Sequence, residues 1–72
     1  MFIFADRLKI CRKNISKTQR QVADDLGITQ SAYQKYELRK NEPKMEMLNK
    51  IADYFDVSVD YLMGRSDNPK RQ

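Results

Sequence analysis

Several residue types that enzymes and metal sites depend on are scarce in this chain. It contains no histidine and a single cysteine, Cys11, among its 72 residues. One cysteine cannot form an internal disulfide, so we expect a reducing compartment. One thiol and scattered carboxylates cannot make a zinc site, so we expect no metal and no cofactor. Without histidine or a glycine-rich phosphate loop, the usual general bases and nucleotide sites are missing, which argues against an enzyme.

Long hydrophobic runs are also missing from the sequence. The apolar start, residues 1–5, gives way to Asp6 and Arg7. Such a run is too short for a signal peptide or a membrane span, so we expect a cytoplasmic protein without membrane contact. A chain of 72 residues forms one domain and buries only about 60% of its unfolded surface, which leaves little room for an enclosed active site. The sequence shows no evident small-molecule ligand.

Positive charge is present in modest excess and is unevenly distributed. Fourteen Lys and Arg against ten Asp and Glu give a net charge of +4. The excess lies in residues 1–13 and 38–44, whereas residues 45–56 are net acidic. This pattern fits one basic face toward a polyanionic partner, and it fits an ordinary solvated surface equally well.

The spacing of apolar residues predicts five helices and no strand. Their expected ranges are 4–13, 18–26, 29–37, 45–55 and 58–63. Thr18, Thr29 and Ser58 have the side chains that cap helix N-termini, and Gln21 completes a capping box with Thr18.

These elements predict an all-α fold, a compact five-helix domain. We expect residues 1–64 to form this domain, since Gly64 can end the last helix. Residues 65–72 are polar and carry scattered charge, so we expect a flexible C-terminal tail or the start of a linker.

The most informative stretch is the pair of helices expected within residues 18–37. The first ends at Leu26 and the second is capped at Thr29, so only Gly27 and Ile28 lie between them. So short a turn forces the two helices to cross steeply and leaves the outer face of the second protruding. This arrangement is typical of a helix-turn-helix, whose second helix lies in the DNA major groove.

Several segments match one family in order and spacing. They are Arg7-Leu8-Lys9, Thr18-Gln19-Arg20-Gln21-Val22-Ala23, Leu26-Gly27-Ile28, Lys35-Tyr36-Glu37, Glu42-Pro43 and Val57-Ser58-Val59-Asp60-Tyr61-Leu62-Met63-Gly64. Together they resemble the lambda-repressor-like helix-turn-helix family, which includes phage Cro and repressor proteins and XRE-type bacterial regulators. The resemblance covers residues 3–64 and implies sequence-specific binding of double-stranded DNA through the major groove. It also implies a transcriptional regulator, chiefly a repressor, that binds a palindromic operator as a homodimer.

One alternative stays open on the same fold: a protein-interaction module such as an antitoxin or an antirepressor. Basic and amide residues on the outer face of the 29–37 helix favour DNA, whereas acidic or apolar residues would favour protein. The sequence puts no acid on that face, and the loop after it is net positive.

The resemblance assigns roles to individual residues, although each would also look ordinary on an exposed surface. The expected base contacts are Gln30, Ser31, Gln34 and Lys35. Glutamine can pair with adenine, and lysine can donate to guanine. The expected phosphate contacts are Gln19, Thr29, Arg39, Lys40, Asn41 and Lys44. Phosphate contacts position the protein but read little sequence. Arg12 and Glu37 match a pair that forms a partly buried ion pair between the first and third helices.

The chain departs from the family pattern near the expected phosphate contacts. Arg39 stands where a glycine is usual, and a left-handed backbone there costs roughly 1–2 kcal/mol. Lys44 stands where a capping Ser or Thr is common, and a cation is mildly unfavourable at that end of a helix. Both poor local choices add positive charge, which supports function overriding local stability in this loop.

Dimerisation is expected from mechanism as well as from the resemblance. One recognition helix reads too few base pairs to select a genomic site, whereas two related by a twofold axis read more. We expect the contact at the last helix, through Val59, Leu62 or Met63. The apolar residues Phe2, Ile3 and Ile10 could also cover a neighbouring chain.

Overall fold

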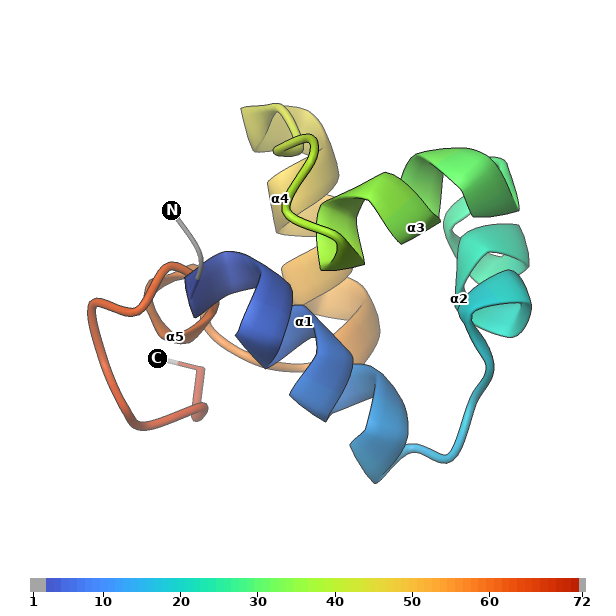
Figure 1. The fold of residues 1–72 in the computed structure, drawn as a ribbon. Coiled ribbons are helices and arrows are strands. Elements are labelled where there is room, and N and C mark those ends of the chain that lie inside the picture. Colours follow the sequence, from blue (N-terminus) through green and yellow to red (C-terminus); the bar gives the residue numbers. More distant parts are fainter. Residues whose placement is uncertain (1–2, 72) are drawn as a thin grey trace.

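Five α-helices joined by short loops make up residues 3–71, the part of the chain that this computed structural model describes (Figure 1). They are α1 (Ile3–Asn14), α2 (Gln19–Leu26), α3 (Gln30–Glu37), α4 (Met45–Phe55) and α5 (Val59–Leu62). Each helix begins and ends within one residue of its predicted bounds, and the all-α five-helix fold is confirmed. Phe2 lies outside the described residues. Within those residues, no helix has the length and apolar character needed to cross a membrane.

Local hydrogen bonds explain where the two central helices begin and end. Thr18 Oγ1 accepts from the backbone N–H of Gln21 at 3.1 Å, and Gln21 Oε1 accepts from the N–H of Thr18 at 2.9 Å. This is the predicted capping box. Gly27 ends α2 with a φ of 76°, a left-handed conformation that glycine adopts at no steric cost. Thr29 Oγ1 then caps α3 by accepting from the N–H of Ala32 at 3.0 Å.

All five helices contribute to one apolar core. Its members are Phe4, Leu8, Cys11, Val22, Ala23, Leu26, Tyr33, Ile51, Ala52, Val57 and Leu62. Ala23 is fully buried, and its small side chain suits the close packing of α2 on α3, which are in extensive contact. Cys11 is buried, and that burial raises the pKa of its thiol. It therefore packs as a small apolar residue.

The surface that we expected to form a dimer is only partly available. Leu62 is fully buried in the core, so the expectation that it contacts a second chain is wrong. A side chain that is fully buried in the core cannot also face a partner. Val59 and Met63 are half-buried and stay candidates. On α1, Ile3 and Ile10 are 42% and 46% exposed.

The segment after α5 swings outward and then turns back beside α5, as Figure 1 shows. Arg7 of α1 donates to the carbonyl oxygen of Ser66 at 2.8 Å and forms an ion pair with Asp67 at 2.8 Å. The backbone N–H of Ser58, just before α5, donates to the carbonyl oxygen of Pro69 at 3.0 Å. These bonds attach residues 65–71 to the helices, whereas the expected boundary at residue 64 stays a prediction.

Candidate nucleic-acid interface

The residues of α3 divide sharply between an exposed side and a buried side. The buried side carries Tyr33, which is fully buried, and Glu37, which is 5% exposed. The exposed side carries all four residues expected to contact bases: Gln30, Ser31, Gln34 and Lys35. Glu37 is the only acid of α3. The exposed side therefore presents amides, a hydroxyl and an ammonium group, and no carboxylate.

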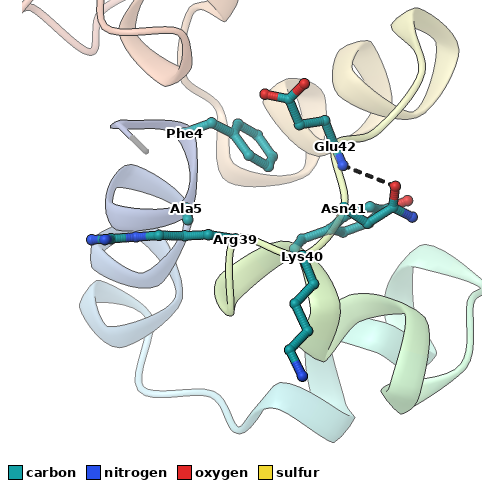
Figure 2. A pocket seen from close by; sticks show the side chains of 7 residues that line it. Phe4, Ala5, Arg39, Lys40, Asn41 and Glu42 are labelled. Atoms are coloured by element: carbon teal, nitrogen blue, oxygen red, sulfur yellow. Dashed lines mark hydrogen bonds between the residues drawn. The ribbon is translucent and has the colours of Figure 1, made fainter. Parts of the chain in front are cut away.

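The loop that follows α3 carries two basic side chains in different directions (Figure 2). Arg39 has a φ of 65°, a left-handed conformation that is strained for a residue other than glycine. Its Nη2 donates to Asp6 Oδ1 of α1 at 2.9 Å, so the guanidinium group turns toward α1. Lys40 is exposed and extends away from that pair. Of the two, only Arg39 is turned toward α1.

A shallow cavity of about 460 Å³ lies between this loop and the start of α1 (Figure 2). Its lining residues are Phe4, Ala5, Tyr36, Arg39, Lys40, Asn41 and Glu42. Asn41 Oδ1 accepts from the backbone N–H of Glu42 at 3.0 Å, and the amide nitrogen of Asn41 can act as a donor. The cavity thus adjoins three of the residues expected to contact phosphate.

Two further expected phosphate contacts, Thr29 and Lys44, are the N-cap residues of α3 and α4. Thr29 caps α3 with its hydroxyl oxygen, and the hydroxyl hydrogen stays available as a donor. Lys44 is the N-cap residue of α4, and its side chain makes no capping bond. The sequence anticipated this missing cap, because lysine has no acceptor atom.

Glu37 is the centre of a hydrogen-bond network that joins α1, α2 and α3. Arg12 and Glu37 form the ion pair that the resemblance implies, with Nε 2.7 Å from Oε2 and Nη2 3.1 Å from Oε1. The hydroxyl of Tyr33 also donates to Oε2. Gln19, at the first position of α2, donates through Nε2 to Oε1 at 3.0 Å. Two of these partners, Tyr33 and Gln19, were not predicted.

The network keeps the Glu37 carboxylate ionised although it is buried. Burial by itself raises the pKa of this carboxyl, but the hydrogen bonds from Arg12, Tyr33 and Gln19 outweigh it and leave the pKa below its ordinary value. The hydrogen bond to Glu37 raises the pKa of Arg12 in turn. Burial and the bond to Glu37 raise the pKa of Tyr33. All three groups therefore hold their usual charge at neutral pH.

Sequence reasoning also missed a contact that supports the turn between α2 and α3. Lys50 of α4 donates through Nζ to the carbonyl oxygen of Leu26 at 2.7 Å. A cation is favourable at the C-terminal end of a helix, where carbonyl groups lack partners. No local signal in the sequence marks this pair, because the two residues lie on different helices.

Residues 8–62 match the sequence profile of a family described as helix-turn-helix. The chain belongs to this family. The resemblance to XRE-type, lambda-repressor-like proteins is thereby confirmed. The helix-turn-helix itself consists of α2, the turn at Gly27 and Ile28, and α3.

Three relatives of this helix-turn-helix protein illustrate the family. It is 46% identical over 68 residues to the uncharacterized HTH-type transcriptional regulator YqaE of Bacillus subtilis, covering 94% of this chain and 59% of that protein. It is 50% identical over 60 residues to the cryptic phage CTXphi transcriptional repressor RstR of Vibrio cholerae, covering 83% and 54%. It is 42% identical over 60 residues to the HTH-type transcriptional regulator AnsR of Bacillus subtilis, covering 83% and 52%. The chain thus spans little more than half the length of these relatives.

Proposed function

We propose that this chain binds double-stranded DNA by placing α3 in the major groove, and that it regulates transcription. The observation that carries the proposal is that α3 has one exposed side and one buried side. Its amide and lysine side chains are exposed together, while Tyr33 and Glu37 anchor its other side in the protein. A helix held in this way can enter the groove without rearrangement, and its amides and ammonium group match the donors and acceptors of base edges.

The proposed contacts fall into two classes. Gln30, Ser31, Gln34 and Lys35 lie on the exposed side of α3 and read bases. The remaining proposed contacts bind phosphate and set the register of the helix in the groove: Gln19, Thr29, Arg39, Lys40, Asn41 and Lys44. Arg39 must leave or share Asp6 to do so, because its guanidinium group is already bonded there.

We further propose that the protein is a repressor that binds a palindromic operator as a homodimer. One relative, at 50% identity, is named a transcriptional repressor. A twofold pair of α3 helices doubles the number of bases read. We place this activity in the cytoplasm, because bacterial and phage genes are transcribed there and the relatives described above are bacterial or phage proteins.

Selection of bound duplexes from a random DNA pool tests the proposal. We expect enrichment of a sequence with two related half-sites about 10 base pairs apart, one helical turn. The Lys35→Ala and Gln34→Ala double variant removes two of the proposed base contacts and keeps the fold, because both side chains are exposed. It should enrich a degenerate sequence or none. If the unaltered protein binds no duplex at low salt, DNA binding is wrong and a protein-interaction module on this fold becomes the better interpretation.

A further inference from the structure

The Glu37 carboxylate accepts four hydrogen bonds from residues of three helices. Arg12 supplies two of them, and Tyr33 and Gln19 supply one each. A carboxylate has about four acceptor positions, so this group is saturated. Being 5% exposed, it has no room to turn toward solvent. Its position and charge are therefore set by the protein alone.

This saturated carboxylate also decides how the Gln19 amide is oriented. An ionised carboxylate can only accept, so it must face Nε2 of Gln19 rather than Oε1. The amide nitrogen carries two hydrogens, and the bond to Glu37 takes one of them. Gln19 is partly exposed and is the first residue of α2. The positive end of a helix dipole lies there, which favours an anion such as phosphate.

We propose that Glu37 is a positioning residue for DNA-backbone binding: it holds the Gln19 amide with one N–H inward, so that the second N–H donates to a phosphate oxygen. This inference rests on the proposed function. It goes beyond the structural role of the Arg12–Glu37 ion pair, because it says that the Glu37 carboxylate also affects the affinity for DNA. That effect acts through the neutral side chain of Gln19. Arg12 fixes the other end of the arrangement, since its Nη1 donates to the carbonyl oxygen of Lys17 just before α2, at 3.0 Å.

A double-mutant cycle between Glu37→Gln and Gln19→Ala tests the proposal. The probe is a duplex of arbitrary sequence, because phosphate contacts do not depend on sequence. We expect Glu37→Gln to lower affinity about two- to tenfold more when Gln19 is present than in the Gln19→Ala background. A neutral amide releases no counterion, so the salt dependence stays unchanged by Gln19→Ala. The general effect of losing a negative charge appears in both backgrounds and cancels.

A second cycle supplies the control. Lys50→Met removes the bond from α4 to the Leu26 carbonyl oxygen and so loosens α2 at its other end without touching Glu37. We expect Lys50→Met to change affinity by the same factor with and without Gln19. If Glu37→Gln behaves as Lys50→Met does, Glu37 is only structural and the proposal is overturned.

A measurement on the unaltered protein keeps the proposal testable if Glu37→Gln does not fold. The two side-chain amide hydrogens of Gln19 give separate NMR signals. We expect one to be shielded from exchange by Glu37 both without and with duplex, and the other to shift when duplex is added. Equal shifts of both hydrogens would overturn the proposal. Absence of any binding to duplex at low salt would instead refute the proposed function, so the two failures are distinguishable.

Discussion

Lys35 and Lys40 are both exposed and lie close together in sequence, but the structure places them in different surroundings. Lys35 lies on the exposed side of α3, whereas Lys40 lies in the loop after it. We therefore expect Lys35→Ala to relax base preference at one or two positions of the selected duplex. We expect Lys40→Ala to weaken all duplexes alike and to reduce the slope of log affinity against log salt by about 0.9.

Binding titrations on selected and arbitrary duplexes over a range of salt separate these effects. Lys70→Ala, in the segment after α5, is the control, since it removes the same charge from a different part of the protein. The distinction between base and phosphate contacts would be wrong if Lys35→Ala and Lys40→Ala gave the same profile.

If Arg39 binds phosphate as proposed, Asp6 competes with DNA for its guanidinium group. Its guanidinium group is bonded to Asp6, and both side chains are about half exposed. Exposed pairs of this kind contribute only about 0–1 kcal/mol, so phosphate can replace the carboxylate. We expect Asp6→Asn to raise affinity for an arbitrary duplex severalfold at low salt, with little change in stability.

Asp67→Asn is the matched control for that experiment. It removes a carboxylate that pairs with Arg7, on the segment after α5. Titrations at two salt concentrations should show tighter binding for Asp6→Asn alone. Equal gains from both variants would mean that overall charge, and not the release of Arg39, sets affinity.

At the scale of the elements, the turn between α2 and α3 depends on Gly27. Its φ of 76° disfavours any side chain, but a Cβ there would meet only Lys50 Nζ, at 3.7 Å. Gly27→Ala should therefore lower the free energy of unfolding through backbone strain alone, by about 1–2 kcal/mol. Urea unfolding followed by circular dichroism measures this change.

Gly64 provides a comparison within the same chain. It has a φ of 77°, and a Cβ there would lie 2.7 Å from Cγ2 of Ile3. Gly64→Ala should cost more than Gly27→Ala, because steric overlap adds to the same strain. A smaller loss at Gly64 would show that Ile3 moves aside easily.

The network that joins α1, α2 and α3 predicts a specific dependence of stability on pH. The pKa of Glu37 is lower in the folded protein than in the unfolded chain. Its contribution is therefore fully present above the unfolded value of about 4.3 and is lost as pH falls through the folded value. Urea unfolding between pH 7 and pH 3 should show this loss, and Glu37→Gln should show less of it.

Asp25 is the control for the pH experiment. Its pKa is also lowered, chiefly by a hydrogen bond from Lys17, but its side chain is 39% exposed. Solvent screens an exposed pair, so Asp25→Asn should leave most of the acid-dependent loss in place. If Asp25→Asn removes as much of the loss as Glu37→Gln, the buried network does not dominate acid unfolding.

At the scale of the whole molecule, the proposed homodimer requires an exposed surface through which two copies can meet. Leu62 is buried and cannot contribute to the expected dimer contact. Val59 and Met63 are half-buried and remain the candidates for that contact. We expect sedimentation with a selected duplex to show two protein chains on each DNA. Met63→Lys should leave the monomer folded and reduce the number of protein chains on each DNA from two to one.

Ile10→Lys, on the exposed part of α1, is the comparison for that experiment. Loss of the second chain with Ile10→Lys, and not with Met63→Lys, would move the contact to α1. Monomers alone, with and without the selected duplex, would refute dimerisation.

The helices and their ends could be predicted because the signals are local. The apolar spacing of α1 and α4 and the caps at Thr18, Thr29 and Gly27 depend on residues a few positions apart. The sequence placed Arg39 where a glycine is usual, and the structure shows that its backbone is left-handed. The exposed side of α3 also followed from the period of the helix, which leaves only one face free.

Contacts between distant residues could not be predicted from such local signals, and the Arg12–Glu37 ion pair was expected only from the family resemblance. The sequence by itself determined five helices, their caps and the amide-rich side of α3. Only the tertiary structure decided that Glu37 holds Gln19, that Asp6 holds Arg39 and that Leu62 is closed off from a second chain. Helix formation depends on neighbours within a turn or two. The direction of a side chain toward another helix depends instead on how all five helices pack.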